Sequence, residues 1–391
     1  MPPSTLPRRR LWPVFVMPGL VVVLAIGWSV FWYVASSEIG RQFDGWQARE
    51  AKAGRIYKCG DLAVGGYPFR FEVSCANASA SLVAQTASQA PIEARVGRIL
   101  AVAQVYNPKL LIAEFTAPAT VLPQGGQSLT AKWSLARASV YGLPEEPQRV
   151  ALVVDNTAID RIVSSVQSPF GRASHVELHG RIAEGSVNDH PVVDIAAELT
   201  AATAEGVHPL AAQPFDMTAT ARIKGLNNLA PKPWPERFRE IQAANGSVEI
   251  VNSRIQQGDM IAVASGTLAI SPQGRLDGEL KMTVAGLERI IPALGLDKLA
   301  NGGIPQATLD RVAPGLKSND LNNAFGALDK LVPGLGGLVK QQAPAAMAAG
   351  LASLGEQTTL EGKRAQAVPL RFANGEVFLG PLRIGDVPPL F

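Results

Sequence analysis

A long uncharged stretch near the start of the chain constrains its fold more than any other feature. Residues 11–34 form a run of 24 residues with no charged side chain, directly behind the basic triplet Arg8–Arg10. An α-helix of this length measures about 36 Å and crosses a hydrocarbon layer of about 30 Å with some tilt. Basic residues favour the cytoplasmic side of a membrane. We therefore expect a cytoplasmic tail over residues 1–10, a transmembrane anchor over residues 11–34, and the rest of the chain across the membrane.

A cleavable signal peptide is the alternative interpretation of the same segment. Signal peptides have apolar cores of about 7–15 residues followed by small residues at the cleavage site. The apolar core here is longer, although Val34–Ser37 resembles a weak cleavage site. Pro13, Pro18 and Gly19 weaken a helix but are tolerated within a membrane.

Residues 35–53 are predicted to form a juxtamembrane helix. Ile39, Phe43 and Trp46 recur at helical spacing, while Arg41 and Asp44 occupy other faces. Two arrangements are open: the helix continues the anchor and docks on the first sheet, or it lies flat on the bilayer.

The charge balance argues against a nucleic-acid partner. The chain has 36 basic and 33 acidic residues, and Arg8–Arg10 supply the whole excess, so the part beyond the anchor is neutral. No basic stripe is available to neutralise phosphates. Charged residues make up 18%, below the usual value of about 25%. The body is therefore unusually apolar, and a partner among lipids or other apolar molecules agrees with this.

After Gly54 the hydrophobic pattern changes to period two, which is typical of half-buried strands. The sequence places strands at residues 69–75, 99–105, 129–135, 215–224 and 276–284, with lengths of roughly 8–13 residues in many cases. No alternation of strands with helices appears, so we expect long antiparallel strands in a curled sheet or groove. The fold class is mainly β with helices (α+β).

Two breaks suggest a domain organisation. A Pro-rich segment at residues 231–235 precedes a short helix over Glu236–Ala244, and separates an N-terminal β region (54–230) from a C-terminal β region (231–391). A second break, residues 286–354, contains helical spacing and an Ala-rich stretch, and we expect a helical insertion there. Strands return at Val368–Phe372 and Val377–Leu379 around an Asn374–Gly375 turn.

Cys59 and Cys75 are the two cysteines of the chain. In an oxidising compartment they are expected to form a disulfide, whereas two thiolates without further ligands nearby make neither a zinc site nor a redox CxxC. Reduced, buried thiols are the alternative.

The sequence contains no recognisable catalytic, cofactor or metal site. His175, Glu177, His179 and Arg181 are expected to share the polar face of one strand, where His175 and His179 lie about 13 Å apart and cannot bind one metal ion. The Gly-x-Ser-x-Gly nucleophile motif is absent, and Gly350–Gly355 is followed by Glu356 where a phosphate-binding loop needs Lys. We therefore do not expect an enzyme.

Two motifs near the ends of the chain are distinctive. The first joins Tyr57–Cys59 to the run Gly65–Cys75, and its turn consists of Gly66, Tyr67, Pro68, Phe69 and Arg70. The second is the tail, with Val368–Phe372, Gly375, Gly380, Pro381 and Pro388–Phe391. A Gly pair permits a tight turn, and Pro at the start of a strand does little harm to the ladder.

Together with the anchor and the strands around Gly266 and Gly278, these motifs resemble the bacterial domain-of-unknown-function family 2125 over nearly the whole chain. The resemblance implies a protein of alphaproteobacteria that is anchored in the inner membrane, faces the periplasm and has no agreed activity. The Gly-punctuated long strands are also similar, in architecture alone, to AsmA-type envelope proteins, whose β grooves are associated with lipid handling.

Three functional hypotheses follow. The chain handles a lipid or another apolar ligand in the cell envelope, since long strands with small apolar residues can form an apolar groove. Alternatively it is an envelope scaffold or assembly factor that binds protein partners through residues 286–354. An enzyme acting on envelope polymers is the third hypothesis, and the sequence favours it least.

Overall fold

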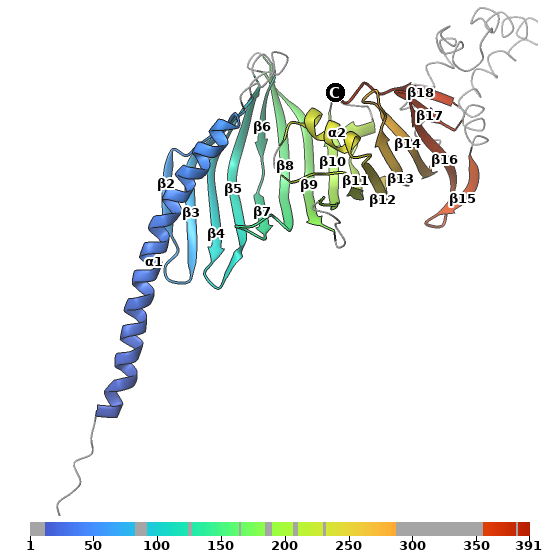
Figure 1. Cartoon of the computed structure of the whole chain (residues 1–391). Coiled ribbons are helices and arrows are strands. Elements are labelled where there is room, and N and C mark those ends of the chain that lie inside the picture. The colour runs from blue at the N-terminus through green and yellow to red at the C-terminus, as the bar shows by residue number, and fades with distance from the viewer. Residues whose placement is uncertain are drawn as a thin grey trace, which may run out of the picture. The chain divides into compact units, whose positions relative to one another are not determined.

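The chain forms two compact units in a computed structural model, Met1–Thr130 and Ala131–Phe391 (Figure 1). Antiparallel strands dominate both units, and the expected class, mainly β with helices, is confirmed. The structure describes residues 12–82, 92–123, 127–163, 166–183, 190–205, 210–229, 232–286, 355–380 and 382–391.

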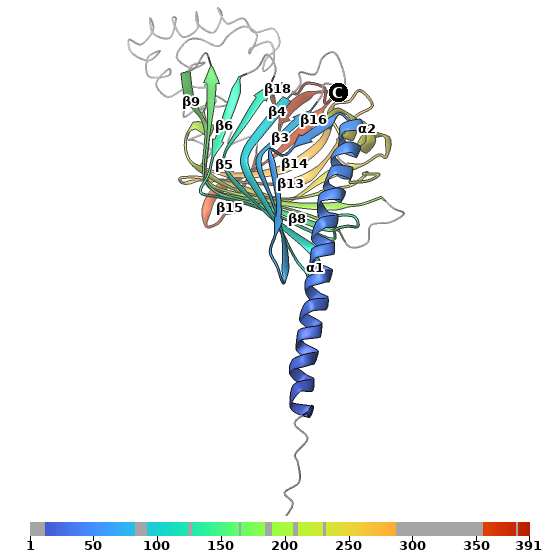
Figure 2. The ribbon, with the colours of Figure 1, turned by 90° about the vertical axis from the view of Figure 1, so that its left-hand side faces the viewer.

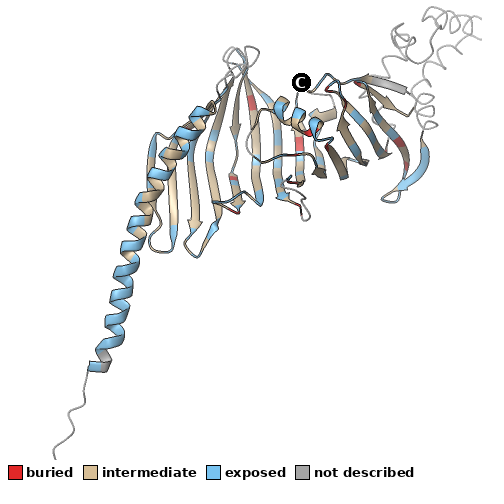
Figure 3. Cartoon of the chain, in the orientation of Figure 1, coloured by how far each residue is buried: buried red, intermediate tan, exposed pale blue. Residues whose placement is uncertain are grey.

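The predicted anchor and juxtamembrane helix form one continuous helix, α1 (Trp12–Lys52), of 41 residues. An apolar window with a mean hydropathy of 2.1 makes α1 long and apolar enough to cross a membrane. Its N-terminal half projects beyond the strands of unit 1, and the side chains described between Phe15 and Trp28 are exposed (Figures 1 and 3). Its C-terminal half contacts β1 and β2, as expected for a helix that continues the anchor and docks on the first sheet.

Among the described residues, five strands lie wholly within unit 1, and they are arranged around β3. The strands β1 and β2 follow one another along one edge of β3, β4 pairs with the other edge, and β5 pairs with β4, all antiparallel. Figure 2 shows α1 beside these blue strands from a second direction. The bounds are β1 (Arg55–Lys58), β2 (Asp61–Gly65), β3 (Arg70–Leu82), β4 (Ile92–Gln104) and β5 (Asn107–Pro123). The following strand β6 (Ser128–Lys132) contains the division between the units.

In unit 2, consecutive strands from β7 to β14 pair antiparallel, β14 pairs with β16, and both β15 and β17 pair with the other edge of β16. Strand β18 pairs with β17. The bounds are β7 (Leu135–Tyr141), β8 (Arg149–Val163), β9 (Val166–Ile182), β10 (Val193–Ala204), η1 (Leu210–Ala212), β11 (Phe215–Ile223), α2 (Trp234–Ala243), β12 (Ser247–Gln257), β13 (Met260–Ile270), β14 (Leu276–Ala285), β15 (Glu356–Leu360), β16 (Lys363–Ala373), β17 (Glu376–Leu379) and β18 (Leu382–Asp386).

Several sequence predictions are confirmed in unit 2. The strands expected at 215–224 and 276–284 are β11 and β14, and the expected short helix is α2. Helix α2 begins at Trp234, two residues earlier than predicted, with Pro233 as its N-cap. The turn at Asn374–Gly375 joins β16 to β17 in the predicted hairpin. Strands β8 and β9 reach 15 and 17 residues, which is longer than expected.

The single strand predicted over Leu129–Leu135 is wrong. Strand β6 ends at Lys132 and β7 begins at Leu135. The backbone N–H of Ser134 donates to the carbonyl oxygen of Asp155 at 3.0 Å, and its hydroxyl donates to the same oxygen at 3.2 Å. Polar contacts of Ser134 therefore occupy the point where a regular strand would continue.

The two domain boundaries expected in the C-terminal half stay predictions. The division expected at residue 230/231 lies within unit 2, where β11 and β12 pair across it. The predicted helical insertion, residues 286–354, lies outside the described residues except for Gly286.

Burial is shallow over most of the sheet. Most strand residues are half-buried, and fully buried side chains are scattered (Figure 3). Ile241 of α2 is buried at 4% exposure beside the close approach of Gly225 to Gly246. Where no second layer packs on a sheet, each apolar side chain is shielded from solvent mainly by its neighbours in the same sheet. The face of such a sheet stays accessible to solvent or to a ligand.

Candidate functional site

The turn between β2 and β3 contacts α1 in the middle of that helix. Trp28 donates its indole N–H to the carbonyl oxygen of Pro68 at 2.9 Å, and Trp32 donates to that of Arg70 at 3.1 Å. The hydroxyls of Ser29 and Tyr67 lie 2.8 Å apart. The turn of the first motif, Gly66–Arg70, is thus joined to the helix by three polar contacts.

Local backbone chemistry explains why this turn has its sequence. The backbone N–H of Arg70 donates to the carbonyl oxygen of Gly66 at 3.1 Å and closes the turn. Gly66 has a φ of +96°, and a Cβ there would lie 2.7 Å from the Arg70 carbonyl oxygen. Only glycine adopts this conformation without strain and clash. The predicted structural role of Gly66 is consistent with this geometry.

Aromatic contacts continue the junction between helix and sheet. Trp32 stacks on Phe71 with ring centroids 5.8 Å apart and meets Tyr67 edge-on at 5.5 Å. Further along the helix, Trp46 stacks on Tyr57 at 4.7 Å. Because stacked and edge-to-face ring pairs stabilise by about 0.5–1.5 kcal/mol each beyond their burial, this junction is a substantial packing interface.

The predicted disulfide joins Cys59 to Cys75, with Cα atoms 5.5 Å apart and a sequence separation of 16. Cys59 lies in the turn between β1 and β2, and Cys75 lies in β3 opposite Leu62 of β2. The bridge therefore links the turn between β1 and β2 to β3, the strand that begins at the first motif.

Unit 1 has an apolar sheet face on the side that faces α1. The register sets the side chains of three strands in rows on this face, and Trp32 of α1 stacks on its first member. All but the buried Cys75 are half-buried. The rows are Phe71, Ala103 and Leu111; Val73, Ala101 and Ala113; and Cys75, Ile99 and Phe115.

Unit 2 repeats this two-faced character. The register aligns aliphatic side chains of β8 to β11 on one face, and the positions between them are polar in β9 and β11 and mixed in β8 and β10. Val150 and Leu178 on this face are more than 40% exposed, at 42% and 43%. The aligned residues are Val150, Leu152, Val154, Val176, Leu178, Ile195, Ala197, Leu199, Met217, Ala219 and Ala221.

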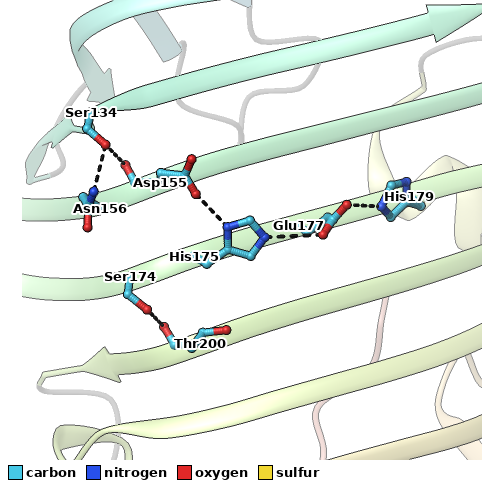
Figure 4. A network of polar contacts seen from close by, with 8 residues as sticks. All are labelled: Ser134, Asp155, Asn156, Ser174, His175, Glu177, His179 and Thr200. Carbon is cyan, nitrogen blue, oxygen red and sulfur yellow. Dashed lines mark hydrogen bonds and ion pairs between the residues drawn. The ribbon is translucent and has the colours of Figure 1, made fainter.

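The opposite face of unit 2 carries a hydrogen-bonded network around His175 (Figure 4). Its Nδ1 lies 2.6 Å from Asp155 Oδ1 on the neighbouring strand, and its Nε2 lies 3.3 Å from Glu177 Oε2. Glu177 Oε1 lies 2.6 Å from His179 Nε2. The predicted shared polar face of His175, Glu177 and His179 is confirmed, whereas the contribution of Asp155 was missed.

The network favours a proton on His175. Two carboxylates accept from its two ring nitrogens, and only the imidazolium form offers an N–H on both. The hydrogen bond with Asp155, followed by that with Glu177, raises the pKa of His175 above its ordinary value of 6.5. The hydrogen bonds with His179 and His175 lower the pKa of Glu177. The network therefore places a protonated imidazole between two carboxylates.

A second polar cluster surrounds Asp194 on the same face. Arg222 donates to Asp194 through Nε at 2.7 Å and Arg181 through Nη2 at 3.2 Å. The hydrogen bond from Arg222 lowers the pKa of Asp194 most. These residues, with Arg149 and His179, line a shallow concavity of about 490 Å³. Exposed ion pairs of this kind stabilise by only about 0–1 kcal/mol, so they mark a hydrated face.

Within the described part of the chain, no group of three or more His, Cys, Asp or Glu side chains is arranged to hold a metal ion. His190 is exposed, and His208 lies outside the described residues.

The tail motif closes the end of unit 2. The N–H of Gly380 donates to the carbonyl oxygen of Pro369 at 2.8 Å, and that of Val387 donates to Gly375 at 2.8 Å. Gly375 is buried with a φ of +85°. Pro381, the remaining motif residue, lies outside the described residues.

These features define a β-rich protein with a disulfide and a helix that is able to span a membrane near its N-terminus. A family model described as an uncharacterized protein conserved in bacteria, DUF2125, matches residues 32–388. The chain belongs to this family, so the resemblance of its terminal motifs is confirmed. No curated protein matches the chain.

Proposed function

We propose that this protein is anchored in the bacterial inner membrane by α1, with its N-terminus in the cytoplasm, and binds the apolar part of a lipid on its sheet face outside the membrane. The observation that carries the proposal is the apolar face of unit 1. Its first row begins at Phe71, which directly follows the turn of the first motif, Gly66–Arg70 (the motif turn), and this turn contacts the middle of α1. An acyl chain leaving the bilayer beside α1 would meet this face first.

Retention of the anchor is supported by the contacts of Trp28, Ser29 and Trp32 with the motif turn. Cleavage behind Ala35 would remove all three contacts and expose the ring of Phe71. A signal peptide has no need for such contacts, because it is discarded before the domain acts.

A periplasmic body is supported by two independent features. The basic residues Arg8–Arg10 precede the apolar helix, which favours a cytoplasmic N-terminus. The Cys59–Cys75 disulfide suits an oxidising compartment. Protease added to spheroplasts should degrade the body, whereas protection of the body from the protease would contradict this orientation.

The size of the side chains supports lipid rather than protein on the apolar face of unit 1. Ala101, Ala103 and Ala113 form its centre, and bulkier residues flank them. These small residues occupy two neighbouring rows of the face and leave more room above the strands than the bulky side chains of the next row, Ile99 and Phe115. An extended acyl chain would pack against these small side chains, whereas the opposite face carries the bulkier Leu100, Val102 and Ile112 next to Glu72 and Glu114.

Photo-crosslinking from two adjacent positions tests the proposal. A benzophenone amino acid at Ala101 would lie on the apolar face, and one at Val102 would lie at the same height on the opposite face. After irradiation in native membranes, mass spectrometry should find lipid adducts at Ala101 and few at Val102. Equal or absent adducts at both positions would refute lipid binding on this face.

The variant Ala113→Arg provides a second measurement. A charge on the apolar face should reduce the lipid that co-purifies with the protein, because an unpaired ion is costly to cover with hydrocarbon. The disulfide and far-UV circular dichroism report whether the variant has folded. The scaffold alternative depends on residues 286–354, which the structure does not describe, and it stays a prediction.

A further inference from the structure

Two turns of unit 1 expose aromatic side chains at one height beside α1. Tyr67 and Phe69 in the β2–β3 turn are 54% and 65% exposed, and Tyr106 in the β4–β5 turn is 74% exposed. The N–H of Val105 donates to the carbonyl oxygen of Phe69 at 3.0 Å and joins the two turns. We call residues 65–70 and 105–109 the aromatic tips.

The contacts with α1 fix the height of the aromatic tips along the helix. Trp28 and Trp32 donate to Pro68 and Arg70, and they lie 16 and 20 residues beyond Trp12. At about 1.5 Å per residue these intervals are ~24 and ~30 Å, close to the thickness of a hydrocarbon core of ~30 Å. If Trp12 marks one boundary of the core, the tips lie at the other.

The composition of the aromatic tips suits a lipid headgroup region. Tyrosine and tryptophan favour the boundary between hydrocarbon and headgroups because one end of each ring system is polar. The tips contain no acidic residue, while Arg70 and Lys109 are basic and complement lipid phosphates. Arg70 also pairs with Glu72 at 2.6 Å through Nε, so this carboxylate offsets part of its charge.

We propose that the aromatic tips insert into the outer headgroup region of the inner membrane, so that α1 and the two turns form one membrane-bound base for unit 1. The proposal rests on the proposed function only for the membrane location of α1, and it does not require lipid binding on the sheet face. Insertion would prevent unit 1 from pivoting about a single helix and would hold the first apolar row against the bilayer.

Depth-dependent quenching in the full chain tests this proposal. The variants Phe69→Cys and Tyr106→Cys carry an environment-sensitive fluorophore, and Leu82→Cys at the far end of β3 is the matched control, being 45% exposed. Each protein is reconstituted in phosphatidylethanolamine and phosphatidylglycerol vesicles that contain lipids with a nitroxide near the headgroup. A fourth label at Val23→Cys, with a nitroxide at the chain end, reports whether α1 spans the membrane.

The labels at 69 and 106 should be quenched by about twofold or more relative to the label at 82, because side chains at this boundary lie 5–10 Å deep at about the nitroxide level. Quenching at 69 and 106 no greater than at 82, with Val23 quenched, would overturn the proposal and indicate a protein partner for the aromatic tips. Loss of quenching at Val23 would instead refute the anchor. Photo-crosslinking at Ala101 remains an independent measure of lipid on the sheet face.

Discussion

The junction of α1 with the sheet should depend strongly on Trp32. Its side chain donates one hydrogen bond, stacks on Phe71 and meets Tyr67 edge-on. A hydrogen bond contributes about 1 kcal/mol and each aromatic pair about 1 kcal/mol. Trp32→Ala should therefore weaken the docking of α1 on the sheet by about 3 kcal/mol. Trp32→Phe keeps much of the ring contact and should cost about 1 kcal/mol.

Hydrogen exchange of β2 and β3 in nanodiscs measures this free energy, because the strands open more often when the helix is poorly docked. A loss of about 3 kcal/mol corresponds to about a hundredfold faster exchange. Tyr33→Ala is the matched control, since Tyr33 is the adjacent residue on the same helix and is 73% exposed. If Trp32→Ala exchanged no faster than Tyr33→Ala, the reasoning about the junction would be wrong.

Three further predictions concern the disulfide, the histidine network and a glycine in unit 2. Replacing Cys59 and Cys75 together by Ala should lower the stability of unit 1 by about 3 kcal/mol, because the bridge closes a loop of 16 residues. Urea unfolding followed by tryptophan fluorescence measures this loss of stability. An unchanged unfolding midpoint would count against the loop-entropy argument. The raised pKa of His175 means that the folded state holds its proton more tightly, so its stabilisation is complete below pH 6.5 and is lost as the pH rises through the raised pKa. The stability difference between wild type and His175→Gln should therefore shrink between pH 6 and pH 8 in thermal melts, and a difference that grows would contradict this sign. Gly266 has a φ of +152°, and a Cβ there would clash with a backbone carbonyl oxygen of β14. Gly266→Ala should cost about 2–3 kcal/mol in urea unfolding, whereas a neutral effect would show that the β13–β14 pairing adapts.

The sequence predicts the local elements well because their signals are local. Strict alternation over Phe215–Ile223 and Leu276–Ala285 identifies β11 and β14, and helical spacing around Phe43 identifies the end of α1. The pairing of Cys59 with Cys75 needed no structure, since the chain offers no third cysteine.

Features that depend on register were not predictable in the same way. Asp155 lies opposite His175 only because β8 and β9 pair in one particular alignment, and a shift of one residue would move Asp155 to the other face. The hydrogen bond from Trp32 to Arg70 likewise joins residues 38 positions apart. Only the packing of the helix on the motif turn shows that Trp28 and Trp32 donate to backbone carbonyl oxygens there.

The apolar faces imply that lipid and stability should be coupled. Apolar sheet faces are normally buried against a second layer, yet among the described residues Ala101, Ala113 and their neighbours stay half-buried. A ligand that binds only the folded state stabilises it by about 2.7 kcal/mol at a hundred times its dissociation constant. Removal of co-purified lipid should therefore lower the urea midpoint of wild type, and it should change that of Ala113→Arg much less. If complete delipidation, verified by mass spectrometry, left both midpoints unchanged, the exposed aliphatic rows would not be a lipid site.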